Sequence, residues 1–355
     1  MNDPVAEFER RFAKLIGSEY CIAVNSGTSA LHAALEAIDV RHGEIIMPAL
    51  CPAMDAFAII HAGAWPIFAD VDPQTHLVTH ETLAKVIGPR TKAIIAVALH
   101  GLPCDIEPIL ALAKPRSIAV IEDCAQCLLG RYRDGFAGTR ADIGCFSFER
   151  KKHLTTGSEG GAIVSNNPLY AKRARKFAGL GYKHMTAQTG RTSLNAAEFQ
   201  HPGYQRFDTI GLNYRMSWAQ AAAGLIALKD VRDAVWRRQE IGYFWQQALG
   251  QSLQPHFYDA DNTFYSAAYD PPTFPYGGWV EGYREFIRRG GDGFYAMPQL
   301  PYNEPALADE YRGLETHPVA ERLQRRLMLF KTHYKSLTVA KEQADILAGM
   351  LNVHA

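Results

Sequence analysis

Residues 147–161 read Ser147-Phe148-Glu149-Arg150-Lys151-Lys152-His153-Leu154-Thr155-Thr156-Gly157-Ser158-Glu159-Gly160-Gly161. Two adjacent lysines follow a strand-like segment and enter a turn rich in threonine and glycine, and Lys152 lies five residues after Ser147. Glycines in such a turn let the backbone pass close to a bulky ligand. A lysine in mid-chain is usually a solvated surface charge, so any chemistry depends on what surrounds this stretch.

Two features upstream lie at the ends of predicted strands. Asp123 ends the segment Ile121-Glu122-Asp123, and the turn Asn25-Ser26-Gly27-Thr28-Ser29 opens a helix. The simplest interpretation of Asp123 is a cap or turn residue, and that of the turn is a helix N-cap. However, a carboxylate at a buried strand end needs a partner. A helix N-terminus also offers free N–H groups and a positive dipole to a phosphate.

A lysine amine, a carboxylate and an anion site together favour pyridoxal phosphate (PLP). The aldehyde of PLP bonds to an amine, its pyridine nitrogen binds an acid, and its phosphate needs N–H donors. Spacing alone does not choose between Lys151 and Lys152. The small-residue turn lacks the G-x-x-x-x-G-K-[ST] and G-x-G-x-x-G patterns, which disfavours nucleoside triphosphate and NAD binding.

Short apolar segments predict a sheet of seven strands. These are Tyr20–Val24, Glu44–Met47, Pro66–Val71, Ala93–Ala98, Ile118–Glu122, Gly144–Phe148 and Ala162–Ser165. Several are apolar throughout, which is typical of strands buried on both faces in a mostly parallel sheet. Ligands of such sheets bind beyond the carboxyl ends of the strands. Ser26, Asp123 and Ser147 lie at these ends, so we expect them in one crevice.

Apolar residues at helical spacing predict helices over 5–16, 30–38, 218–228, 231–248, 318–330 and 338–352. Residues 183–210 are polar and predict a long loop, a lid or a partner contact. Residues 255–302 are rich in Tyr, Phe, Gly and Pro and predict a small antiparallel sheet. We therefore expect a large PLP-binding domain over residues 1–235 and a small C-terminal domain over residues 236–355.

Composition narrows the partners and the compartment. The 355 residues carry 37 basic and 37 acidic side chains, which argues against nucleic acid or an anionic membrane as the main partner. No apolar run reaches the roughly 18 residues of a membrane span, and the N-terminus lacks a signal-peptide core. We expect a cytoplasmic protein.

The six cysteines have irregular spacing, which favours buried free thiols. Cys124 and Cys127 form a C-x-x-C pair, but no second pair at matching spacing completes a zinc site, so no metal is expected. A redox motif stays open as an alternative, because the pair follows a predicted strand.

Six motifs in order resemble those of the DegT/StrS-type sugar aminotransferases. They are Asn25–Leu31, Phe68–Pro73, His100–Asp105, Ile121–Gln126, Ser147–Gly161 and Leu212–Ser217. The resemblance covers most of residues 5–230 and continues weakly to the C-terminus. It implies the aspartate-aminotransferase-like α/β fold: a mostly parallel seven-stranded sheet sandwiched by helices, plus a smaller C-terminal α+β domain.

The resemblance also assigns the catalytic residues. It implies that Lys152 bonds to PLP and moves a proton as general base and acid, and that Asp123 binds the pyridine nitrogen. The amino group would come from L-glutamate or L-glutamine and pass to a small carbonyl acceptor.

Further contacts to the cofactor are implied in the same way. Gln126 matches a residue near the ring hydroxyl, and Thr28, Ser29 and Ser147 match phosphate contacts. Asn213 matches an asparagine that reaches the neighbouring subunit's phosphate, which implies a homodimer.

The sequence departs from the family pattern in places that bear on the acceptor. Pro52 stands where an aromatic ring usually stacks on PLP, so Pro52, Met54 or another residue must cover the ring. An N-terminal segment common in the family is absent before the first predicted helix, and the C-terminal part around 295–299 differs most. A nucleotide-linked keto sugar is the default acceptor, and a smaller keto or aldehyde compound is the alternative.

Three hypotheses follow. The first is a PLP-dependent aminotransferase. The second is a PLP-dependent sugar dehydratase, although such family members carry histidine in place of the lysine found here. The third is a PLP-binding non-catalytic homologue, which the missing aromatic ring and N-terminal segment motivate.

Overall fold

A computed structural model describes residues 3–190, 194–250, 260–307 and 316–351. Its central sheet has the strand order β1-β9-β8-β5-β4-β2-β3. The strands are β1 (Tyr20–Val24), β2 (Glu44–Pro48), β3 (Trp65–Ala69), β4 (Thr91–Val97), β5 (Ala119–Asp123), β8 (Ile143–Ser147) and β9 (Gly161–Ser165). Strand β9 is antiparallel to both β1 and β8, so the other six strands share one direction. The predicted, mostly parallel, seven-stranded sheet is confirmed.

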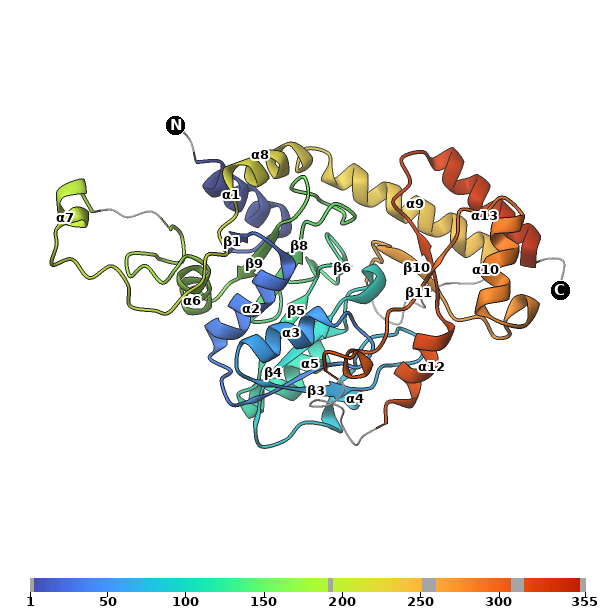
Figure 1. Cartoon of the computed structure of the whole chain (residues 1–355), viewed down its shortest axis with the longest axis horizontal. Helices are drawn as coiled ribbons and strands as arrows, with labels where there is room; N and C mark the ends of the chain where they lie inside the picture. The colour runs from blue at the N-terminus through green and yellow to red at the C-terminus, as the bar shows by residue number, and fades with distance from the viewer. Residues whose placement is uncertain (1–2, 191–193, 251–259, 308–315, 352–355) are drawn as a thin grey trace.

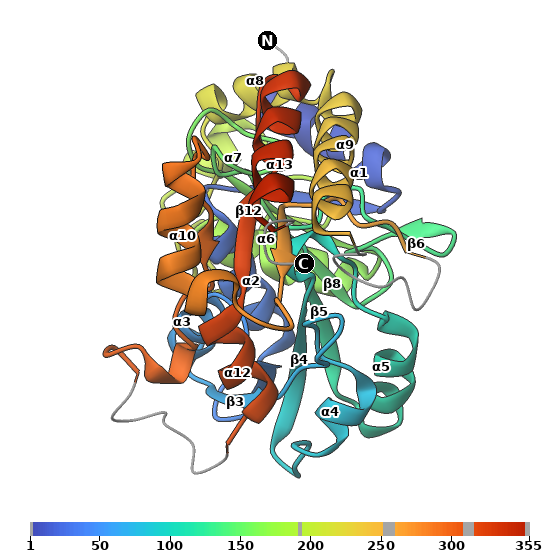
Figure 2. The same ribbon diagram turned by 90° about the vertical axis from the view of Figure 1, so that its right-hand side faces the viewer.

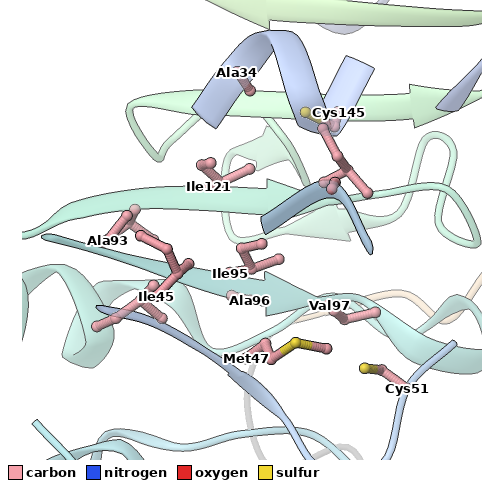
Figure 3. Packing of buried hydrophobic residues seen from close by; sticks show 14 of the residues in the cluster. Ala34, Ile45, Met47, Cys51, Ala93, Ile95, Ala96, Val97, Ile121 and Cys145 are labelled. Carbon is pink, nitrogen blue, oxygen red and sulfur yellow. The ribbon is translucent and has the colours of Figure 1, made fainter. Parts of the chain in front are cut away.

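Helices cover both faces of this sheet. Alternate residues of a strand point to opposite faces, so each strand contributes side chains to both layers of helices. Ile22 and Val24 join a core cluster with α2 (Gly27–Ile38), α3 (Met54–His61) and α6 (Pro168–Ala178). Cys21 and Ala23 join a second cluster with α1 (Pro4–Ile16) and α8 (Trp218–Ala227). Figure 3 shows Ile45, Ile95 and Ile121 side by side in the first cluster. Both faces of the sheet are therefore dry, which explains its apolar strands.

The C-terminal part builds a second, antiparallel sheet of order β10-β12-β11. Its strands are β10 (Ser266–Tyr269), β11 (Tyr295–Ala296) and β12 (Met328–Lys331). Helices α9 (Val231–Leu249), α10 (Trp279–Arg288) and α13 (Leu337–Leu351) pack on it around Trp245, Phe286 and Phe330. Figures 1 and 2 show α9 and α13 side by side in this part.

One helix prediction was wrong here. The helix expected over 318–330 ends early as α12 (Pro318–Arg326), and the following apolar residues form the central strand β12. Periodicity does not separate a short apolar strand from the end of a buried helix. The antiparallel sheet expected within 255–302 forms only in part: β10 and β11 lie in this segment, but α10 separates them and both strands pair with β12. Residues 255–259 and 352 lie outside the described residues.

Apart from four 3₁₀-helices of three residues each, the other elements of the described residues are also short. They are α4 (His80–Ala84), α5 (Ile106–Ala113), the hairpin of β6 (Arg131–Tyr132) and β7 (Gly135–Phe136), and α7 (Ala196–Gln200). The prediction of a loop throughout 183–210 was wrong at helix α7. The Asn195 side chain caps this helix by accepting a hydrogen bond from the Glu198 N–H. In Figure 1 the segment that carries α7 projects from the body of the protein. Residues 191–193 lie outside the described part.

Candidate active site

The carboxyl ends of three strands bring the predicted residues to one edge of the sheet. Ser26 follows β1, Asp123 ends β5 and Ser147 ends the neighbouring β8. The N-terminus of α2 touches the end of β8: a Cβ on Gly27 would lie 2.8 Å from the Ser147 Cβ. Glycine at this position therefore allows the helix N-terminus to reach Ser147.

The turn before α2 caps the N-terminus of this helix, which agrees with the simplest interpretation of residues 25–29 from the sequence. The Ser26 Oγ accepts a hydrogen bond from the Ser29 N–H at 3.0 Å. The Ser29 hydroxyl donates to the Asn25 Oδ1 at 2.7 Å, and the Thr28 side chain is exposed. The cap orients the start of α2 and its positive dipole end beside Ser147, a suitable environment for a phosphate.

Asp123 is buried at the end of β5. Its Oδ1 accepts a hydrogen bond from the Ala125 N–H at 2.9 Å. Burial raises the pKa of the Asp123 carboxyl, while the Ala125 N–H, the charge of Lys152 and a hydrogen bond with Asp55 act in the opposite direction. This carboxyl can accept a further hydrogen bond from a cationic donor, which would favour its ionised form.

The two lysines of the loop after β8 differ in their surroundings. The side chain of Lys151 is exposed, whereas the Lys152 Nζ lies 4.4 Å from the centroid of the Tyr265 ring. Burial lowers the pKa of the Lys152 amine, and the charges of Asp123 and Glu149 oppose that shift. A lowered pKa increases the fraction of neutral amine, the form that attacks an aldehyde. Of the pair, Lys152 is the residue close to Asp123.

A cavity of about 370 Å³ opens beside Lys152. The Gln126 Oε1 accepts a hydrogen bond from the His100 N–H at 2.9 Å at its wall. Pro52 and Met54 line the same cavity, so both remain candidates to cover the PLP ring. The full lining is Pro52, Met54, Leu99, His100, Gln126, Lys151, Lys152, Tyr265, Ser266, Tyr295, Ala296, Met297, Pro298, Leu329, Lys331 and His333. The volume is in the range of small-molecule sites.

Sequence reasoning missed three residues of the site. Arg238 on α9 donates hydrogen bonds to the main-chain carbonyl groups of the lysine loop. Tyr265 provides the ring beside Lys152, and Asp55 on α3 lies buried against Asp123. Of these, only Asp55 had a local signal, as an acid within the otherwise apolar segment 49–60.

Asn213 lies on the surface, outside the cavity lining. Its side chain is exposed, and its Oδ1 accepts a hydrogen bond from the Arg215 Nε at 2.9 Å. Large apolar side chains close to it in sequence are exposed too, among them Ile210, Leu212 and Trp218. An exposed apolar surface of this kind is typical of a protein–protein contact.

The cysteines are all free and buried, as predicted. Burial raises the pKa of both thiols of the C-x-x-C pair, Cys124 and Cys127, which makes them poor nucleophiles. Within the described ranges, no group of three or more metal-ligating side chains could hold a metal ion. No helix in the described part of the chain is long and apolar enough to cross a membrane.

The fold is that of the PLP-dependent aminotransferases. A model of the DegT/DnrJ/EryC1/StrS aminotransferase family matches residues 2–266, so this chain belongs to that family and PLP is its cofactor. The X-ray structure of the aminotransferase from Psychrobacter cryohalolentis superposes with a TM-score of 0.89 at 27% identity. That superposition covers 100% of this chain and 93% of the other.

Two curated relatives share the name GDP-perosamine synthase. The protein from Escherichia coli O157:H7 is 37% identical over 71% of this chain. The protein from Caulobacter vibrioides is 36% identical over 70% of this chain. The matched region spans 65% and 62% of the length of these relatives, less than two thirds of each.

Proposed function

We propose that this chain transfers an amino group from L-glutamate or L-glutamine to a keto sugar, most simply a nucleotide-linked one. The observation that carries the proposal is the juxtaposition of the buried Asp123 carboxyl and the Lys152 amine, which influence each other electrostatically. The relatives named GDP-perosamine synthase support a nucleotide-linked acceptor. A smaller keto or aldehyde compound is the alternative acceptor.

The residues of the site fit PLP. Lys152 offers a partly desolvated amine, Asp123 offers a buried acid, and the N-terminus of α2 lies against Ser147. We assign Gln126 to the ring hydroxyl, and Thr28, Ser29 and Ser147 to the phosphate. When bound, PLP supplies an aldehyde that bonds to amines and a cationic ring that takes up electron density from the substrate.

The chain's own residues control the proton movements. Asp123, as a carboxylate, keeps a proton on the pyridine nitrogen through a charge-assisted hydrogen bond. Lys152 accepts the proton from Cα of the amino donor and returns it to C4′ of the cofactor, as general base and then general acid. Its lowered pKa increases the fraction of neutral amine, the form that a general base requires. The acceptor half of the reaction uses the same groups in reverse order.

The cavity beside Lys152 supports an anionic substrate. Lys151 and Lys331 line it together with the rings of Tyr265 and Tyr295, whereas His333 lines it as a neutral imidazole because burial lowers its pKa. The two lysine ammonium groups would attract a carboxylate, as in the amino donor, or a phosphate, as in a nucleotide-linked sugar. The same lysines therefore serve both half-reactions, and screening of carbonyl compounds identifies the acceptor.

The test is the absorption spectrum of the PLP-loaded protein before and after addition of L-glutamate and of L-glutamine. We expect one donor to convert the lysine-bound form of the cofactor to its amino form, and the keto acid to appear in equal amount. Acceptor candidates are then added to the aminated protein, and nitrogen incorporation is measured by mass spectrometry. A product that lost a hydroxyl group without gaining nitrogen would favour the dehydratase hypothesis. PLP binding with no response to any donor would favour the non-catalytic one.

We further propose a cytoplasmic homodimer in which Asn213 completes the phosphate site of the neighbouring subunit. The exposed side chains Leu212 and Trp218 support a contact surface beside Asn213, and the six buried free thiols agree with a reducing compartment. Mixing two inactive variants, Lys152→Ala and Asn213→Ala, tests the arrangement. Hybrid dimers contain one intact site only if Asn213 acts across the interface. Failure to regain any activity, with hybrid dimers shown by native mass spectrometry, would place Asn213 elsewhere.

A further inference from the structure

A second carboxyl group lies against Asp123. Asp55, in the first turn of α3, is 1% exposed. Among the described residues, its Oδ1 contacts no conventional hydrogen-bond donor. The group that faces it is instead the carboxyl of Asp123, which lies within hydrogen-bond reach of the Asp55 carboxyl and is itself buried. Two carboxyl groups share a hydrogen bond only when one of them is protonated, so this contact requires a proton on one of the two.

The surroundings decide which residue carries that proton. Burial, together with the negative charge of Asp123, raises the pKa of Asp55 well above its ordinary range. Asp123 is buried as well, but its ionised form gains the Ala125 N–H, the charge of Lys152 and the hydrogen bond from Asp55. Asp55 is therefore the neutral acid and the hydrogen-bond donor, and Asp123 is the carboxylate that accepts it.

We propose that Asp55 is a positioning residue, a neutral carboxylic acid that donates a hydrogen bond to Asp123 and holds it as an oriented carboxylate toward the pyridine nitrogen. The inference rests on the role of Asp123 in the proposed function. A buried carboxylate without enough donors would take up a proton and lose its attraction for the ring nitrogen. Ala125 and Asp55 supply two donors, and the protonated ring nitrogen supplies a third.

A purely structural role for Asp55 makes a different prediction. An acid in the first turn of a helix is stabilised by the helix dipole as an anion. In that case Asp55 would be ionised, and its loss would change the stability of the protein without changing the ring nitrogen. The location of the pair between α3 and β5, beside Lys152, favours the positioning role.

Infrared spectroscopy of the cofactor-free protein tests directly whether the Asp55 carboxyl is protonated. We expect the wild-type protein at neutral pH to show the carbonyl stretch of a buried protonated carboxylic acid. That band should shift on labelling with ¹³C-aspartate and disappear in Asp55→Asn. A spectrum in which Asp55→Asn removes no such band would overturn the proposal. This measurement contains no PLP, so it stands or fails independently of the proposed function.

Two matched variants then test the consequence for the cofactor. Asp55→Asn keeps an N–H donor toward Asp123, whereas Asp55→Leu has a similar volume and no donor. We expect Asp55→Leu to weaken PLP binding about tenfold or more, the loss of one hydrogen bond to a charged group, and Asp55→Asn to retain most of the affinity. With ¹⁵N-labelled PLP, NMR should show a protonated pyridine nitrogen in the wild type and Asp55→Asn, and a partly deprotonated one in Asp55→Leu.

An unchanged ¹⁵N shift in Asp55→Leu would contradict the positioning role. If Asp55→Leu does not fold, Asp55→Ser, which keeps a hydroxyl donor, and Asp55→Ala, which does not, form the replacement pair. If the wild-type protein itself binds no PLP, the proposed function fails, and the infrared band alone then decides whether the acid pair exists.

Discussion

The guanidinium of Arg238 donates a hydrogen bond to the main-chain carbonyl of Lys152, with the Nη2 and the carbonyl oxygen 3.3 Å apart. The same nitrogen also binds the carbonyl of Lys151, and Nη1 binds the Thr332 hydroxyl at 3.3 Å. Arg238 is buried on α9, and burial lowers its pKa to about 10. The helix that leads into the C-terminal part of the chain thus fixes the lysine loop of the large sheet.

The first prediction concerns this contact. Arg238→Met keeps the apolar stem but leaves carbonyl acceptors of the lysine loop without their donor. Each such buried acceptor costs about 1–3 kcal/mol, so we expect the free energy of unfolding to fall by at least about that amount. Capture of PLP should slow as well, because Lys152 loses its fixed main chain. Urea unfolding and stopped-flow absorbance measure the two effects.

Arg237→Met is the matched control, since Arg237 is the exposed neighbour on the same helix. We expect it to change neither quantity measurably. If Arg238→Met unfolds at the wild-type urea concentration and captures PLP at the wild-type rate, the hydrogen bonds to the lysine loop contribute neither to stability nor to PLP capture.

The second prediction separates the two adjacent lysines. Lys152→Ala should bind PLP only non-covalently, because the exposed Lys151 is not the amine held close to Asp123. Lys151→Ala should retain the covalent bond. Borohydride reduction followed by peptide mapping locates the covalent bond: the wild type should carry the reduced cofactor on Lys152. Cofactor found on Lys151 instead would reverse the assignment.

The third prediction is a pH dependence. Burial lowers the pKa of Lys152 below its ordinary value of 10.5, and Asp123 opposes the shift by stabilising the ammonium form. Only the neutral amine bonds to PLP, so the capture rate should rise with pH and level off below the pH expected of an exposed lysine. Removing the Asp123 charge lowers the pKa of Lys152 further. The plateau in Asp123→Asn should therefore begin at a lower pH than in the wild type.

Borohydride trapping over roughly pH 6 to 10 gives both profiles. The titrations of free PLP are common to the two proteins, so the difference between the initial trapping rates isolates the effect on Lys152. A plateau at the same pH in both proteins would mean that the carboxyl of Asp123 is uncharged in the cofactor-free protein.

The sheet and its functional edge could be predicted from sequence for local reasons. Short apolar runs bounded by turns specify buried strands, and the carboxyl ends of parallel strands meet, which placed Ser26, Asp123 and Ser147 together. Residue types could not choose between Lys151 and Lys152, because their difference is burial against Tyr265, a residue 113 positions beyond Lys152. Arg238 and β12 were missed for the same reason: each acts through partners distant in sequence.

The last prediction uses two glycines at helical positions that differ in the space around them. Gly349 in α13 has no atom within 4 Å of an added Cβ. Because alanine lowers the conformational entropy of the unfolded chain, Gly349→Ala should stabilise the protein by about 0.5–1 kcal/mol. Gly27 begins α2, where alanine also favours a helix, but its Cβ would lie 2.8 Å from the Ser147 Cβ. We expect Gly27→Ala to push the N-terminus of α2 away from β8, destabilise the protein by about 1–3 kcal/mol and weaken PLP binding. Urea unfolding of both variants and titration of each with PLP measure these effects. A gain of stability in Gly27→Ala equal to that in Gly349→Ala, with unchanged PLP affinity, would show that α2 does not depend on its close approach to Ser147.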